Sequence, residues 1–257
     1  MIARIFKRLA PFAVLAMGVA LTGCSNVDMT INGEEGVPLA DLDIGGAAPT
    51  DLVVATDANV IVSEGETLNI VVEDDPDNAL RFTLDESTIG VTSEPGFSFT
   101  DGSPVVRITM PAPQSIVIAG SGAVQAATVS STPEIVIGGS GSVAIDSIAA
   151  ETLEISIGGS GSIKGAGTAQ RLEVTIGGSG DVLLAGLKAD RAEISIGGSG
   201  NVAFASDGEV EANIAGAGDI NVTGTAKCTL NSFGSGNLNC TAANSEAQAE
   251  PAITEEN

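Results

Sequence analysis

Hydrophobic and polar residues alternate over the second half of the chain, and the alternation returns at a nearly constant interval. From Ser115 onward, short runs such as EIVI and SVAI stand on either side of a Gly-Ser-Gly or similar triplet. Alternation with a period of two is typical of β-strands that bury one face. Glycine between two such runs permits a sharp bend. Each unit therefore predicts two short strands joined by a tight turn.

Seven copies of this unit follow one another at intervals of 18 to 20 residues. A unit this short cannot bury a core alone, but stacked units merge their apolar positions into continuous columns. The spacing predicts an all-β fold, a single-stranded parallel β-helix with a right-handed coil and about seven regular coils over residues 115–241. A β-propeller is the main rival, but its blades need about 40 residues or more. The glycines that open the triplets are Gly120, Gly139, Gly159, Gly178, Gly198, Gly216 and Gly234.

Stacking also predicts columns of identical side chains on the surface. One is a serine column beginning at Ser121, and another is acidic. Like charges about 5 Å apart repel, so the acidic column must be solvated or relieved by cations. Exposure without any cofactor is the simpler interpretation, and a row of weak Ca²⁺ contacts is the alternative. The acidic column comprises Glu134, Glu154, Glu173, Glu193 and Glu211.

The segments around the repeats predict the domain organisation. Residues 51–114 contain irregular strand-like runs, which we expect to form first coils or a β cap, because solenoids need atypical ends. They join the repeats in one domain over 51–241. Residues 25–50 are rich in Gly, Pro, Asp and Asn and predict a tether. Residues 242–257 are polar and acidic and predict a disordered tail.

Residues 1–24 have the three parts of an export signal. A basic start is followed by the apolar run from Leu9 to Leu21, too short for a membrane-spanning helix. The run ends in Leu-Thr-Gly-Cys, which resembles the lipobox of bacterial lipoproteins, in which the cysteine is lipidated after cleavage. The sequence therefore predicts an exported lipoprotein held in a membrane through Cys24. Ser25 favours the outer membrane and leaves open whether the protein faces the periplasm or the exterior.

Two further cysteines, Cys228 and Cys240, remain near the end of the repeats. An exported protein folds in an oxidising compartment, so we expect them to form a disulfide. A metal site is not expected, because the chain has no histidine and no CxxC pair.

Composition excludes several classes of function. The formal net charge is −23 and the few basic residues form no cluster, which argues against nucleic acid as a partner. The absence of histidine excludes a Ser-His-Asp or Cys-His enzyme. Some β-helices cleave acidic polysaccharides with carboxylates beside Arg or Lys. Here the carboxylates are spread out, and we expect no basic column beside them.

One family combines these features. The run VVRITMPA from Val105 to Ala112, followed by strand–GGSG–strand units, resembles the auto-transporter adhesin head GIN domain family (DUF2807) over residues 51–240. The resemblance implies a β-helical, adhesin-like head that is exported or lipidated, and it brings no defined catalytic or binding residues. We expect a non-enzymatic cell-envelope lipoprotein that binds or scaffolds a polysaccharide or protein surface. The alternative is a carbohydrate-active β-helix protein, and the oligomeric state stays open.

Overall fold

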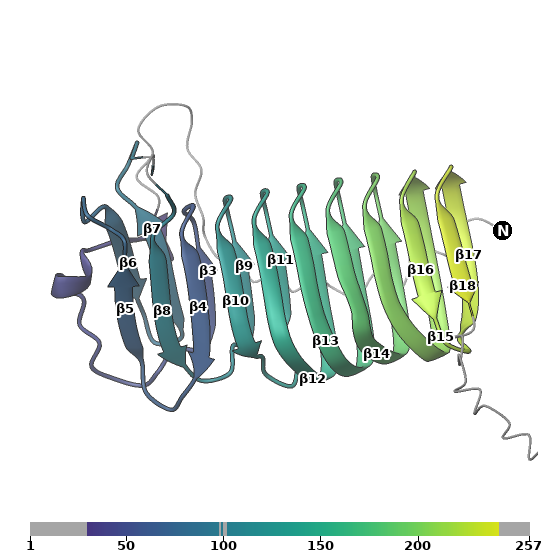
Figure 1. Ribbon diagram of the computed structural model, residues 1–257, viewed down its shortest axis with the longest axis horizontal. Helices are drawn as coiled ribbons and strands as arrows, with labels where there is room; N and C mark the ends of the chain where they lie inside the picture. Colours follow the sequence, from purple (N-terminus) through teal and green to yellow (C-terminus); the bar gives the residue numbers. More distant parts are fainter. Residues whose placement is uncertain (1–29, 98, 100–101, 242–257) are drawn as a thin grey trace, which may run out of the picture.

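The fold is an all-β solenoid that extends from a broader cap (Figure 1). The computed structural model describes residues 30–97, 99 and 102–241. The predicted export signal, Cys24 and the predicted tail over 242–257 lie outside the described residues. Within the described part there is no α-helix, and one 3-10 turn, η2, covers Leu39–Asp41. No helix of the described part is long and apolar enough to cross a membrane.

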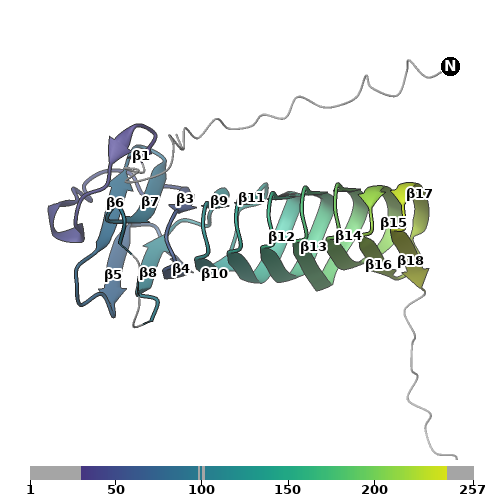
Figure 2. The same ribbon diagram turned by 90° about the horizontal axis from the view of Figure 1, so that it is seen from above.

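The regular coils are parallel and in register, which confirms the predicted parallel β-solenoid of about seven turns (Figure 2). Four of the strands, β12 to β15, are long because each includes the second half of one coil and the first strand of the next. The strands of this part are β9 (Ser115–Ile118), β10 (Ala123–Thr128), β11 (Glu134–Ile137), β12 (Ser142–Ile157), β13 (Ser162–Ile176), β14 (Asp181–Ile196), β15 (Asn201–Gly216), β16 (Asp219–Thr223), β17 (Lys227–Gly234) and β18 (Asn237–Thr241).

The core is a set of aliphatic columns inside the coil. One column pairs Ile135 with Ile155, Ile155 with Val174 and Val174 with Ile194, and all four side chains are buried. Branched side chains suit this position because they pack well on a pleated strand surface. The narrow interior explains why so few aromatic residues are needed, with Phe204 the large side chain of the later coils.

The N-terminal end of the solenoid is closed by antiparallel strands. β8 lies beside β4 and carries β5 antiparallel on its other edge, while β7 lies beside β3 and carries β6 antiparallel. These pairings are the atypical end that the sequence predicted for residues 51–114. The strands are β3 (Asp51–Val54), β4 (Asn59–Glu64), β5 (Asn69–Glu73), β6 (Leu80–Leu84), β7 (Thr88–Ser93) and β8 (Val105–Met110).

Residues 30–50 differ from the tether expected over 25–50. They form a small hairpin, β1 (Thr30–Ile31) with β2 (Glu34–Glu35), and Val37 bridges to Phe82. Ile31 is buried against Gly90, where any larger residue would overlap the Ile31 side chain. The sequence did not reveal this contact, because a single apolar residue among Gly, Asn and Glu carries no periodic signal. The predicted tether therefore shortens to residues 25–29, which lie outside the described part.

Candidate binding face

The five glutamates form one column on the outside of the solenoid. Register pairs Glu134 with Glu154, Glu154 with Glu173, Glu173 with Glu193 and Glu193 with Glu211. Each glutamate stands just before an inward-facing aliphatic residue, so the alternation of the strand directs its side chain outward. The column is bounded at one end by Ser115 and at the other by Thr229, which occupy the same position in their coils.

The environment of the column changes along its length. Glu134, Glu154 and Glu173 are half-buried, whereas Glu193 and Glu211 are exposed. Burial raises the pKa of the Glu134 carboxyl, and the charges of Glu154 and Asp51 raise it further. Asp51 lies in the same column beyond Ser115, and burial together with the Asp85 charge raises its pKa as well. The cap end of the column is therefore the part where a carboxylate charge is least well solvated.

A second column, two residues before the glutamates, is largely basic. Arg171 pairs with Arg191, Arg191 with Glu209 and Glu209 with Lys227. The expectation of no basic column beside the carboxylates is therefore wrong. The basic residues are too far apart in the sequence to look like a cluster, and stacking brings them together. The recurring R-x-E at 171–173 and 191–193 was the signal available in the sequence.

Ion pairs connect this basic column to carboxylates. Arg191 Nη2 lies 3.2 Å from Glu209 Oε2 in the next coil, and Arg171 Nε lies 3.9 Å from Glu173 Oε1 in its own strand. The four side chains are between 45% and 67% exposed, so each pair contributes little to stability, about 0–1 kcal/mol. The Arg171–Glu173 pair lowers the repulsion in the middle of the acidic column, whereas the Arg191–Glu209 pair lies within the second column.

A third outward column lies two residues after the glutamates and carries hydroxyl and amide groups. It runs from Ser156 through Thr175, Ser195 and Asn213 to Asn231. Asn231 Nδ2 donates to Asn213 Oδ1 at 3.2 Å, so the amides are linked between coils. We call the glutamates from Glu154 to Glu211, together with this hydroxyl and amide column, the polar face.

A shallow groove of about 230 Å³ lies at the C-terminal part of the polar face. Its polar lining includes Arg191, Glu193, Glu209, Glu211 and Lys227. The carboxylates stand in a row along the rod and do not converge. Accordingly, no group of three or more Asp, Glu, Cys or His side chains in the described residues is arranged to hold a metal ion.

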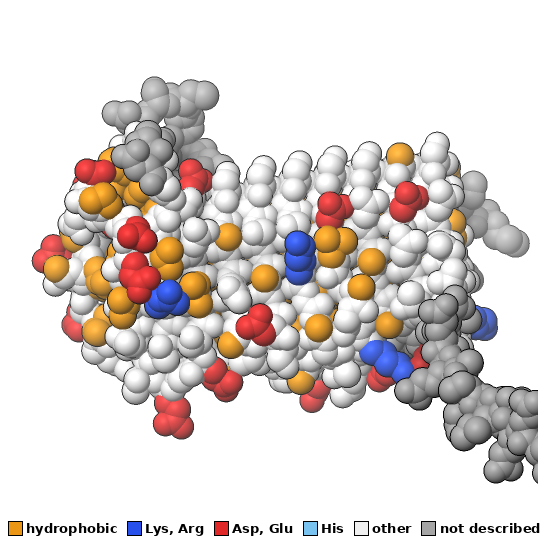
Figure 3. Space-filling view, in the orientation of Figure 1, with side chains coloured by type: hydrophobic (Ala, Val, Ile, Leu, Met, Phe, Trp, Pro, Cys, Tyr) orange, Lys and Arg blue, Asp and Glu red, His pale blue; other side chains and the backbone are white. Residues whose placement is uncertain are grey.

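A larger hollow of about 940 Å³ lies in the cap. Leu39, Val72, Phe82, Phe97 and Phe99 supply its apolar lining, and the acidic turn at residues 74–77 borders it. In the space-filling view, acidic and hydrophobic side chains lie close together over the cap, while hydrophobic side chains along the rod are scattered (Figure 3).

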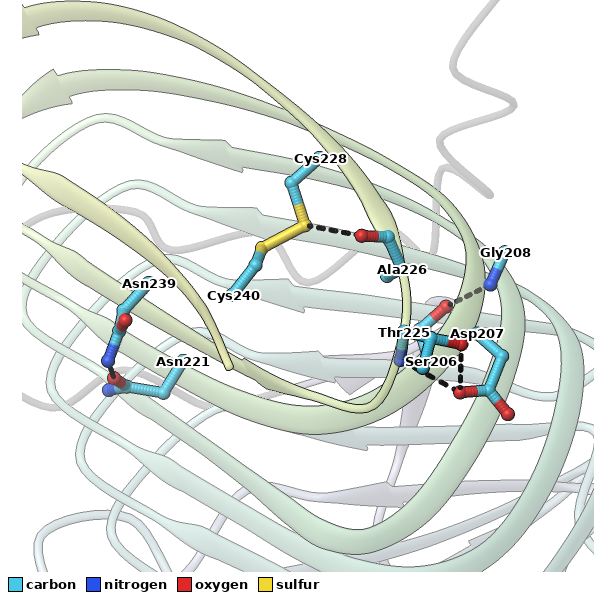
Figure 4. Close-up of a disulfide and its surroundings, with 9 residues drawn as sticks. All are labelled: Ser206, Asp207, Gly208, Asn221, Thr225, Ala226, Cys228, Asn239 and Cys240. Carbon is cyan, nitrogen blue, oxygen red and sulfur yellow. Dashed lines mark hydrogen bonds between the residues drawn. A yellow bond between two sulfur atoms is a disulfide. The ribbon is translucent and has the colours of Figure 1, made fainter. Parts of the chain in front are cut away.

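The two cysteines of the last coils form the predicted disulfide. Cys228 and Cys240 point toward each other across the inside of the coil, with their Cα atoms 6.8 Å apart (Figure 4). Cys228 continues the buried column of Ala192 and Val210, and Cys240 continues the column of Phe204 and Val222. The disulfide therefore replaces core packing where the solenoid ends.

A polar corner near the disulfide joins three coils. Lys188 Nζ lies 2.6 Å from Asp207 Oδ2, and Thr225 donates to Asp207 Oδ1 from its backbone nitrogen at 2.9 Å and its hydroxyl at 3.0 Å. The hydrogen bond from Lys188, followed by those from Thr225, lowers the pKa of Asp207 to about 2. This cluster is a structural link between coils.

The fold and the polar face define a repeat solenoid with an extended, periodic surface. The chain belongs to the family described as "putative auto-transporter adhesin, head GIN domain" (DUF2807), whose model matches residues 48–226. This confirms the resemblance seen in the sequence. No curated protein matches the chain.

Several solved structures share the fold. A putative adhesin from Bacteroides fragilis is 20% identical, with a TM-score of 0.66, and the match covers 76% of this chain and 93% of that one. A putative lipid binding protein from Parabacteroides distasonis is 19% identical, with a TM-score of 0.58 and the same coverage. A putative adhesin from Parabacteroides merdae is 16% identical, with a TM-score of 0.57 over 76% and 92% of the two chains. At these identities the likeness extends to the fold alone.

Proposed function

We propose that this chain is a non-enzymatic, exported lipoprotein of the cell envelope whose polar face binds a neutral, hydroxyl-rich polysaccharide lying along the rod. The observation that carries the proposal is the register of the polar face. Four successive coils each present a carboxylate and, two residues later, a hydroxyl or amide. Coils recur about every 4.8 Å, so a linear polymer can meet the same pair of groups several times.

The chemistry of the polar face favours a neutral polymer over an acidic one. Carboxylates accept strong, charge-assisted hydrogen bonds from sugar hydroxyls. An acidic polysaccharide would be repelled by Glu154, Glu193 and Glu211, and the ion-paired Arg171 and Arg191 offset only part of that repulsion.

A glycan array with the purified chain from Ser25 to Asn257 tests this proposal. We expect binding to neutral polysaccharides that is at least tenfold weaker in the variant Glu173→Gln/Glu193→Gln. The variant Asp181→Asn/Asp219→Asn is the matched control, because it removes the same two charges from the neighbouring strand face. Binding of no glycan, or equal losses in both variants, would refute the proposed role of the polar face.

Anchoring is a separate part of the proposal. The lipobox-like sequence before Cys24 and membership of a family described as an adhesin head both support attachment to the outer membrane. Mass spectrometry of the protein extracted from membranes should find acyl chains on residue 24, and Cys24→Ala should release the protein into the soluble fraction. Added protease should cleave the protein on intact cells if it faces the exterior and leave it intact if it faces the periplasm.

One observation favours a carbohydrate-active enzyme as a second candidate. Glu193 and Glu211 are neighbours in register beside Arg191 and Lys227 in the shallow groove. Glycosidases use two nearby carboxyl groups, one of which must stay protonated through burial. Both glutamates are exposed, which disfavours this candidate. Release of reducing ends from a polysaccharide by the wild-type chain, lost in Glu193→Gln, would overturn the non-enzymatic proposal.

A further inference from the structure

The two ends of the solenoid are finished differently. At the N-terminal end, β3 and β4 are covered by β7 and β8, which in turn carry antiparallel strands (Figure 1). At the C-terminal end, β17 pairs only with β15 and β18 only with β16 among the described residues. The last coil therefore presents two strand edges, on the side away from β15 and β16, whose backbone N–H and C=O groups pair with no other strand of the described residues. Such edges are templates for pairing with another chain.

The exposed end is also apolar. Leu230 continues the core column of Ile194 and Ala212, yet 40% of its surface is exposed because no coil follows it in the described residues. Phe233 is 89% exposed and stands at a position that Gly197 and Ala215 fill in the two preceding coils. The disulfide between Cys228 and Cys240 holds β17 and β18 together, so the end is rigid before any partner arrives.

The charges of the solenoid stop at this end. Thr229 follows Glu211 in the glutamate column, Asn237 follows Asp219, and Lys227 follows Glu209. The last coil, residues 227–241, contains no Asp or Glu and one Lys, in a chain with a formal net charge of −23. Two copies of so acidic a chain repel each other over most of their surface. The last coil is a place where they can approach without that repulsion.

We propose that the last coil is an end-to-end interface between two copies of this chain. A two-fold arrangement places β17 antiparallel to β17 of the second copy and extends the sheet across the interface. Leu230 lies on the inner face of β17 and Phe233 on its outer face, so the joined sheet covers Leu230 with the core of the second copy and extends the outer surface beside Phe233. The segment 242–257 is a poorer occupant, because its sequence has a single large apolar residue, Ile253, together with four glutamates and a proline.

Sedimentation velocity of the chain from Ser25 to Asn257 over a range of concentrations tests the interface. We expect a reversible monomer–dimer equilibrium whose dimer has the frictional ratio of a rod twice as long. The variant Thr229→Glu/Asn237→Asp continues both acidic columns into the last coil at exposed positions, so like charges meet across the interface. It also removes the hydrogen bond from Asn237 Nδ2 to Asp219 Oδ1, so its far-UV circular dichroism and Tm are measured first to verify that it is folded. We expect its dimerisation to be at least tenfold weaker.

The matched control is Gln125→Glu/Gln170→Glu, which adds the same two charges at exposed positions away from the last coil and should dimerise like the wild type. A wild-type chain that stays monomeric, or a dimer that Thr229→Glu/Asn237→Asp does not weaken, overturns the proposal. A dimer that forms only after removal of residues 242–257 also overturns it, because that segment would then be the occupant. None of these outcomes depends on glycan binding by the polar face.

Discussion

Two adjacent glycines in one turn should respond in opposite ways to the same substitution. A Cβ built at Gly159 would overlap the carbonyl oxygen of Gly139 in the preceding coil and lie 2.9 Å from its carbonyl carbon. A Cβ at Gly158 would meet nothing closer than the Ile137 carbonyl oxygen at 3.9 Å, an ordinary contact. Neither glycine has a positive φ, so the backbone conformation accepts alanine at both positions. The difference between the two sites is therefore the closeness of the coils alone.

The loss of stability in Gly159→Ala depends on whether the atoms that the new methyl group meets can move away. The group that Gly159→Ala strikes is backbone held by coil-to-coil hydrogen bonds, among them Ser160 N to Gly139 O at 3.0 Å, and it cannot rotate away as a side chain would. Forcing a methyl group into a packed site costs about 1–3 kcal/mol. Gly158→Ala should instead stabilise by about 0.4–1 kcal/mol, because alanine restricts the unfolded chain more than glycine does.

Thermal unfolding followed by far-UV circular dichroism measures both effects. For a chain of this size, Gly159→Ala should lower Tm by roughly 2–12 °C, and Gly158→Ala should leave it unchanged or raise it by a few degrees. Gly178→Ala repeats the first test one coil later, where a Cβ would overlap Gly159. Equal Tm values for Gly158→Ala and Gly159→Ala would refute the close-approach reasoning.

Three further predictions concern the disulfide and two carboxylates. The variant Cys228→Ser/Cys240→Ser should lower the free energy of unfolding by about 3 kcal/mol. Its hydrogen exchange should be faster in β17 and β18 than in the middle coils, and equal acceleration in all coils would contradict a local role of the disulfide. Glu134 has a raised pKa, so its ionised carboxylate opposes folding, and Glu134→Gln should stabilise the protein at neutral pH. Urea unfolding should show that this gain in stability over the wild type vanishes at pH values below 4.5. Asp207 has a lowered pKa, so its ionised carboxylate stabilises the folded state above the unfolded pKa of 3.8, and this stabilisation disappears as the pH falls toward about 2. Asp207→Asn should therefore lower the free energy of unfolding at neutral pH only. A loss of stability that persists at about pH 2 would contradict the pairing with Lys188.

The sequence predicted the solenoid well because its signal is repeated in every coil. Period-two alternation, the glycine triplets and their 18-to-20-residue spacing each recur seven times, so local errors average out. The same spacing predicted which side chains stack in one column, and the glutamates from Glu134 to Glu211 lie where it placed them. The disulfide between Cys228 and Cys240 was likewise expected from the export signal and the pair of leftover cysteines.

The basic column and the packing of residues 30–50 could not be predicted by the same means. Arg171, Arg191 and Lys227 are separated by 20 and 36 residues, and only the register places them in one column. Ile31 is buried through contact with Gly90, nearly 60 residues later, and such a contact depends on how the cap strands cross. Both features arise from non-local geometry that a single sequence without periodicity does not encode visibly.

The direction of the hydrogen bonds in the solenoid has a mechanical consequence. Bonds between coils run along the rod, so a force that pulls the two chain ends apart should peel the coils one at a time. Each released coil of 18 to 20 residues adds roughly 60–70 Å of extended chain. At the C-terminal end the load passes from Cys240 through the disulfide to Cys228, and residues 229–239 are spared from extension. Reduction of that bond would lengthen the path under load, so the oxidised rod extends less under force than the reduced one.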